Sequence, residues 1–245
     1  MSYKKESPLL YAYNRSLHPH RVRFNQSNGI EFFGSEQDSR CLHSFLMFWT
    51  GYSISMTRHV ESWIRGAGES CARQGMEKVG QHLQRHAHHE KDHDQMLVAD
   101  LKVLVQLWND KYGDRVSAAE LETMKVPTST HDYAVMHEEV IKGRHPYCQI
   151  AIEFEIERLS ITVGPQWVEN VVYTLGQEYA EGLTFLTHHV VLDQGHTQFN
   201  SKLIENCLKE DSARLEPLVQ TGQLALEIYG RFLKDCVEAS KVLAQ

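Results

Sequence analysis

The segment Phe-Leu-Thr-His-His-Val-Val-Leu-Asp-Gln-Gly-His, residues 185–196, carries the strongest signal for the fold. It places His189, Asp193 and His196 at positions i, i+4 and i+7, which form a single stripe on an α-helix. Leu186 and Leu203 continue this stripe on either side. The pattern predicts a long amphipathic helix over about 178–209, whose apolar face has three polar side chains at its centre.

A second triplet with the same spacing, His86, Glu90 and His93, lies in the first half of the chain. It belongs to a segment from about 70 to 112 that we predict as one long helix. The rest of its inward stripe is apolar and consists of Leu83, Leu97, Leu101, Leu104 and Trp108. For this composition, roughly 0.1 triplets of the type His, acidic residue, His are expected by chance. Two solvated polar faces would be the alternative, but the flanking leucines favour two inward-facing sets of functional residues.

Histidines and carboxylates on the inward faces of neighbouring helices are typical of a carboxylate-bridged dinuclear metal site. Mixed nitrogen and oxygen donors favour iron or manganese, and six or seven candidate ligands exceed the four that zinc usually takes. A third helix should supply a further carboxylate, for which Glu153, Glu155 and Glu157 are the candidates. We prefer Glu157, because its stripe is otherwise apolar and an unpaired carboxylate there would be costly. Glu153, one turn earlier on the same face, is the alternative, and a purely solubilising glutamate run is the third interpretation.

The other segments predict more helices and no sheet. Apolar residues recur at steps of three and four over about 35–65, where Gly66 and Gly68 should end the helix. Further helices are expected at about 131–142 and 146–163, in a short segment ending near Leu175, and at about 212–243. Residues 151–157 alternate apolar and acidic side chains like a half-buried strand, but no hairpin turn adjoins them, so we predict a helix.

We therefore predict an all-α fold with a single domain of seven or eight helices over residues 35–245. An irregular N-terminal arm should precede it over residues 1–34, because Pro8, Pro19, Gly29 and Gly34 interrupt this polar stretch.

The composition narrows the class of function. The 245-residue chain has 25 Lys and Arg against 32 Asp and Glu, which leaves no basic surplus for nucleic acid. No apolar run approaches the length of about 18 residues that a membrane helix needs. Five scattered cysteines argue against a disulfide framework and favour a cytoplasmic location. The sequence contains no motif for a serine hydrolase, for nucleotide triphosphates or for NAD.

Residues 185–196, the run from His86 to Asp94 and the inward Glu157 together resemble the heme-oxygenase-like diiron oxidase and oxygenase superfamily. The resemblance covers about residues 40–205. It implies the helical bundle that heme oxygenase, TenA proteins and pyrroloquinoline quinone synthase share, with two Fe(II) ions and no heme. The ligands that it implies directly are Glu157, His189, Asp193 and His196.

The predicted first ligand helix departs from the family pattern. Many members have a glutamate seven residues before the histidine, and this chain has His86 at that position relative to His93. Glu90, three residues before His93, is also on the inward face. Either His86 or Glu90 could complete the set of ligands, and the sequence leaves this choice open.

The resemblance implies an iron-dependent oxidoreductase that uses O2 for oxidative cleavage, desaturation or N-oxygenation in a biosynthetic pathway. We expect a small amino acid or amine as substrate, an external electron donor where the reaction needs one, and a homodimer by analogy of fold. The alternatives are a fatty-acid oxidase, a TenA-like or cofactorless enzyme on the same fold, and a metal-binding bundle without turnover. A TenA-like hydrolase would need a cysteine nucleophile, for which Cys148 and Cys207 are the candidates.

Overall fold

The structure is a computed structural model that describes residues 7–36 and 38–244, and all regular secondary structure in this part of the chain is helical, without a strand. The all-α prediction is therefore confirmed. The described residues form more helices than the seven or eight expected, because two segments predicted as continuous are broken, residues 8–35 form two helices, and a short helix lies at 118–122. The α-helices are α1 (Pro8–Asn25), α2 (Asn28–Ser35), α3 (Ser39–Thr57), α4 (Val60–Arg73), α5 (Glu77–His89), α6 (His93–Tyr112), α7 (Ala118–Glu122), α8 (Thr128–Lys142), α9 (Gln149–Thr162), α10 (Gly164–Leu175), α11 (Thr184–Glu210) and α12 (Leu215–Ala244).

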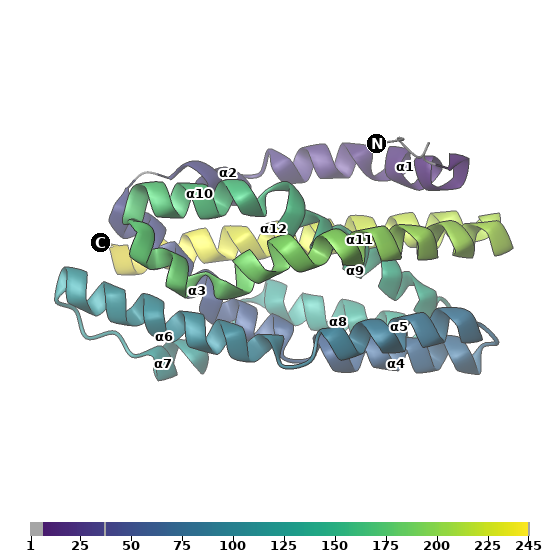
Figure 1. Ribbon diagram of the computed structural model, residues 1–245, viewed down its shortest axis with the longest axis horizontal. Helices are drawn as coiled ribbons and strands as arrows, with labels where there is room; N and C mark the ends of the chain where they lie inside the picture. The colour runs from purple at the N-terminus through teal and green to yellow at the C-terminus, as the bar shows by residue number, and fades with distance from the viewer. Residues whose placement is uncertain (1–6, 37, 245) are drawn as a thin grey trace.

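The long helices run nearly parallel to the long axis of the molecule (Figure 1). α9 lies in the middle and packs against both α11 and α12. α1, α2 and α10 cover one side of these helices, while α3 to α8 form the other side (Figure 1). None of the helices in the described ranges is long and apolar enough to cross a lipid bilayer.

The prediction of an irregular N-terminal arm is wrong for residues 7–35, which form α1 and α2; residues 1–6 lie outside the described part. Ser7 caps α1 by accepting a hydrogen bond from the Leu10 amide (3.3 Å). Tyr13 and Leu17 are fully buried, so α1 belongs to the core. Pro8 occupies the first turn of α1, where proline is well tolerated, and Pro19 lies inside the helix without ending it.

The first long segment, expected over 35–65, is broken after Thr57, and its second part continues as α4 to Arg73. Gly66 and Gly68, expected to end the helix, both lie inside α4. A Cβ on Gly68 would lie 2.8 Å from the Gly80 carbonyl oxygen of α5. Gly68 therefore allows α4 and α5 to pack closely instead of ending a helix.

The second long segment, expected as one helix over 70–112, is also broken. α5 ends at His89 and α6 starts at His93, and Asp92 between them has the left-handed backbone conformation (φ 63°). Nothing in the local sequence marks this break, because neither proline nor glycine lies near it. The triplet His86, Glu90, His93 thus spans a helix junction.

Residues 151–157 form a helix as predicted, within α9. The period-two pattern has a simple explanation: α9 is buried on opposite sides, and its glutamates are buried too. Glu155 forms a buried ion pair with Arg21 of α1 (2.6 Å) and accepts a hydrogen bond from the Tyr13 hydroxyl (3.0 Å). This ion pair attaches α1 to the central helix.

Candidate metal centre

Four helices and one helix junction bring the seven predicted ligands into a single buried region. His86 is in α5, Glu90 follows α5, and His93 begins α6. Glu157 comes from α9, and the remaining three come from α11. All seven side chains are at most 9% exposed: His86, Glu90, His93, Glu157, His189, Asp193 and His196.

Two groups of these side chains could each hold an ion. In the four-residue group, made of His86, Glu90, Glu157 and His196, one donor atom of each residue lies within 4.8 Å of the others. The three-residue group, made of Glu90, His93 and His189, satisfies the same condition. Glu90 is the residue common to both groups.

The two oxygens of Glu90 face different partners. Oε1 lies 3.5 Å from His86 Nε2 and 3.5 Å from His196 Nδ1. Oε2 lies 3.0 Å from His93 Nδ1 and 3.9 Å from His189 Nε2. The structure therefore brings both alternatives left open by the sequence, His86 and Glu90, into the same cluster.

Several of these buried nitrogen and oxygen atoms lie close together but have no hydrogen-bond partner among the described residues. His86 Nε2 lies 2.8 Å from Glu157 Oε1, yet neither atom has a hydrogen-bond partner in the described part of the chain. His196 Nδ1 and Asp193 Oδ1, 3.3 Å apart, are also buried without one. Buried polar atoms without partners are costly, about 1–3 kcal/mol each. Nitrogen and carboxylate donors arranged in this way fit a divalent metal ion that accepts their lone pairs.

The electrostatics of the four-residue group agree with this arrangement. Burial lowers the pKa of His86, but the neighbouring Glu157 and Glu90 outweigh burial and raise it well above the usual value. Burial raises the pKa of Glu90, but the neighbouring imidazoles of His189, His86 and His93 outweigh it and hold this pKa well below the usual value. The carboxylates are thus ionised and attract cations, either protons on the imidazoles or metal ions.

Three further contacts orient the candidate ligands. His189 Nδ1 donates to the Phe185 carbonyl oxygen (2.7 Å), so its Nε2 is directed toward Glu90. Asn200 donates to Glu157 Oε2 (2.7 Å), and Ser160 donates to Asp193 Oδ2. Asn200 and Ser160 are not among the residues predicted from the sequence, although Asn200 lies one turn beyond His196 on the same stripe.

Three of the candidate acidic residues, Asp193, Glu153 and Glu155, lie outside both groups. Asp193 contacts His196 and is bonded to Ser160, and only its Oδ1 is free to turn toward the centre. Glu153, the alternative to Glu157, accepts a hydrogen bond from Gln149 (2.5 Å), and burial raises its pKa to about 8. Glu155 is on the opposite side of α9 in its ion pair with Arg21.

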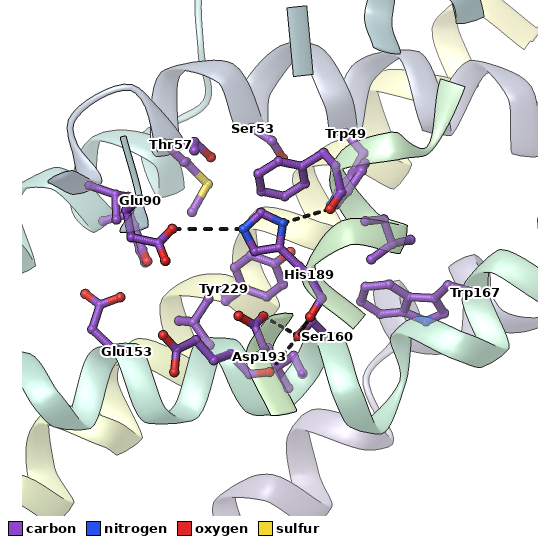
Figure 2. Close-up of a pocket in the computed structure, with 18 residues that line it drawn as sticks. Trp49, Ser53, Thr57, Glu90, Glu153, Ser160, Trp167, His189, Asp193 and Tyr229 are labelled. Carbon is purple, nitrogen blue, oxygen red and sulfur yellow. Dashed lines mark hydrogen bonds and ion pairs between the residues drawn. The ribbon is translucent and has the colours of Figure 1, made fainter. Parts of the chain in front are cut away.

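A largely apolar cavity opens onto the centre (Figure 2), with about 120 Å³ of it accessible to the centre of a water molecule. Figure 2 shows Glu90 and Glu153 directed toward the same space, with His189 beside them. Aromatic side chains including Trp49 and Trp167 form much of the wall. None of the described residues that line this cavity is Lys or Arg.

No protein-family model and no curated protein sequence matches the chain. Solved structures do match. A domain of unknown function with a heme oxygenase-like fold from Shewanella denitrificans is similar with a TM-score of 0.76 and 12% identity, over 96% of this chain and 94% of that one. A TenA homolog from Pseudomonas syringae pv. tomato has a TM-score of 0.70 and 13% identity, over 97% and 96% of the two chains.

Heme oxygenase-1 from the cyanobacterium Synechocystis, in complex with heme, has a TM-score of 0.54 and 13% identity, over 96% of this chain and 97% of that one. These similarities extend beyond residues 40–205 and include the N-terminal helices. At this level of identity they establish the fold. The chain therefore has the heme-oxygenase-like fold.

Proposed function

We propose that this protein is a non-heme diiron oxidase or oxygenase that uses O2 to oxidise a small amine or amino acid. The observation that carries the proposal is Glu90, whose two oxygens face two separate sets of imidazole and carboxylate donors beside a largely apolar cavity. A single-metal site would need only one of these sets. Both sets are rich in imidazole and carboxylate, the donors that iron and manganese take up readily.

In this proposal, His86, Glu157 and His196 would hold one Fe(II), His93 and His189 would hold the other, and Glu90 would be shared between them. Asp193 would join the first set through its Oδ1. The iron pair would supply the binding and reduction of O2. The protein itself would neutralise the charge of the ions with carboxylates, it fixes the imidazoles through contacts such as His189 with Phe185, and it places a largely apolar cavity beside them.

Glu153 supports an amine as the substrate. Its carboxyl group lines the cavity outside both ligand groups, and in the absence of Lys and Arg among the lining residues it has no fixed cation as a partner. A protonated amine entering the cavity would be such a partner, and its charge would favour the ionised form of this carboxyl group, whose pKa burial raises to about 8. A fatty acid would place its carboxylate near those of Glu90 and Glu157, which repel it unless both ions are bound.

The TenA-like alternative has the same support from fold similarity, but the cysteines argue against its hydrolase form. Cys148 and Cys207 do not line the cavity beside the centre. Burial raises the pKa of Cys148 to about 12 and that of Cys207 to about 11, so neither thiol is a ready nucleophile. A heme in this cavity would bring its propionates near acidic groups without a basic partner.

The decisive experiment is anaerobic loading with Fe(II), followed by measurement of iron per chain and of O2 consumption with a panel of amines, amino acids and fatty acids. We expect about two irons per chain, and O2 uptake that depends on iron and on an amine. His189→Ala should lose iron, whereas the matched control His188→Ala, which removes the exposed neighbouring histidine, should retain it. The proposal would be refuted if His189→Ala bound as much iron per chain as the wild type, or if activity survived chelation of iron.

A further inference from the structure

A second depression reaches the candidate centre from the surface between α5 and α11. It is a groove lined mainly by imidazole and amide side chains. His86 and His196, both in the four-residue group, line this groove as well. The complete lining is Gln81, Gln84, Arg85, His86, His88, His89, Leu192, Gly195, His196 and Phe199.

His89 connects the solvent with the centre in this groove. It is exposed, and its Nδ1 lies 3.4 Å from Nε2 of the buried His196, with the two rings stacked at 5.5 Å and 12°. The other nitrogen of His196, Nδ1, faces Glu90 and Glu157. Imidazole donors therefore follow one another from the surface at His89 to the interior at His196.

Gly195 keeps the groove open in front of His196. It is exposed in the interior of α11, where glycine destabilises a helix by roughly 0.5–1 kcal/mol relative to alanine. A Cβ at this position would meet no other atom within 4 Å. No packing constraint therefore requires glycine here, and the open space leads directly past it.

The groove offers an entering cation donor groups that are exposed to solvent. The cavity wall also carries carboxylates, Glu90, Glu153, Glu157 and Asp193, but these are buried, and aromatic side chains such as those of Trp49 and Trp167 lie among them. In the groove, His88, His89 and the two glutamines are exposed, so their donor atoms can replace the water around an ion one molecule at a time. The one cationic side chain in the lining, Arg85, is engaged with His82 Nδ1 (2.8 Å).

We propose that Fe(II) reaches the centre through this groove, with His89 as a transient ligand that passes the ion to His86 and His196. This inference rests on the proposed function, because it requires that the centre bind iron. The two openings then have different roles: the cavity admits the organic substrate, and the groove admits the metal.

The test is the rate of iron uptake. Metal-free protein is mixed anaerobically with Fe(II) alone, samples are separated from free iron at short times, and iron per chain is counted until it reaches a plateau. His89→Ala removes the transient ligand, and Gly195→Phe fills the groove without removing any donor. The controls are Gly195→Ala, which adds only a Cβ, and His188→Ala, which removes an exposed histidine outside the groove lining.

We expect the initial rate to fall by about tenfold in His89→Ala and Gly195→Phe, the lower end of the losses seen when a group supporting a metal ligand is removed. The plateau should stay at the wild-type value in both, and the controls should load at the wild-type rate. Circular dichroism confirms that each variant is folded.

Wild-type uptake rates in both test variants would overturn the inference while leaving the proposed function intact. A slow His89→Ala with a normal Gly195→Phe would also overturn it, because His89 would then only position His196. If the wild-type chain binds no iron at equilibrium, the proposed function fails, and this inference fails with it.

Discussion

Glu90→Gln offers the sharpest test of the dinuclear arrangement, because this substitution keeps the shape of the side chain and removes only its charge. Glu90 belongs to both ligand groups, with Oε1 facing His86 and His196 and Oε2 facing His93 and His189. Glu157 belongs to one group only. The two glutamates should therefore differ in how many ions they hold.

The expected magnitude follows from this count. Removing a residue that merely supports a ligand lowers metal affinity by about 10- to 100-fold, so losing a direct ligand costs at least about 1.4–2.8 kcal/mol per ion. Glu157→Gln should lose this binding free energy for one ion. Glu90→Gln should lose it for both ions, which weakens the summed binding free energy by at least about 3–6 kcal/mol.

The assay is an anaerobic Fe(II) titration followed by calorimetry and by counting iron after gel filtration. Glu90→Gln should retain less than one iron per chain, and Glu157→Gln about one. Glu153→Gln is the matched control: it removes a buried carboxyl group one turn from Glu157 but outside both groups, so it should bind as the wild type does. A Glu90→Gln variant that keeps both ions would refute the bridging role, and so would a Glu153→Gln variant that loses one.

Three further predictions concern stability. Burial lowers the pKa of His137 and of His43 from 6.5 to about 4, so the unfolded chain binds protons first as the pH falls. Each residue thus contributes stability that is complete above pH 6.5 and is lost toward pH 4, by up to about 3 kcal/mol. Urea titrations at several pH values give the slope of the free energy of unfolding against pH, and His137→Gln should remove about half of the slope that the two histidines cause together. An unchanged slope would contradict this account. Glu155→Ala removes the carboxylate of the buried ion pair with Arg21 and should cost about 3–5 kcal/mol in the free energy of unfolding, whereas a loss below 1 kcal/mol would show that this ion pair does not secure α1. Gly195→Ala should raise that free energy by roughly 0.5–1 kcal/mol, seen as a higher melting temperature in calorimetry; a lower melting temperature would mean that the space at Gly195 is not free.

The sequence was sufficient for the features that depend on periodicity. The stripe through His189 and His196 predicted α11, and the inward position of Glu157 followed from the apolar residues on its face of α9. The ambiguous alternation over residues 151–157 was correctly assigned to a helix, since a lone strand would have had no partner. These features are local consequences of helical geometry, so one sequence contains them.

The features that the sequence could not predict depend on tertiary contacts. The backbone at Asp92 is left-handed without a glycine or proline to signal it, and this break orients Glu90 between the two ligand groups. α1 was missed because its prolines suggested an irregular chain, whereas Tyr13 and Arg21 form their stabilising contacts with Glu155, more than a hundred residues away. The hydrogen bonds from Asn200 and Ser160 are likewise visible only once α9 and α11 are packed together.

The burial of α9 on opposite sides has a consequence for hydrogen exchange. Its backbone amides are enclosed by α11, α12 and, through the ion pair of Glu155, by α1, so no local opening exposes them. Deuterium uptake by a peptide covering residues 149–162 should therefore report global unfolding of the whole bundle. An ion held by Glu157 would slow that uptake by its own contribution to global stability, which makes this one peptide a gauge of metal occupancy that needs neither turnover nor a known substrate.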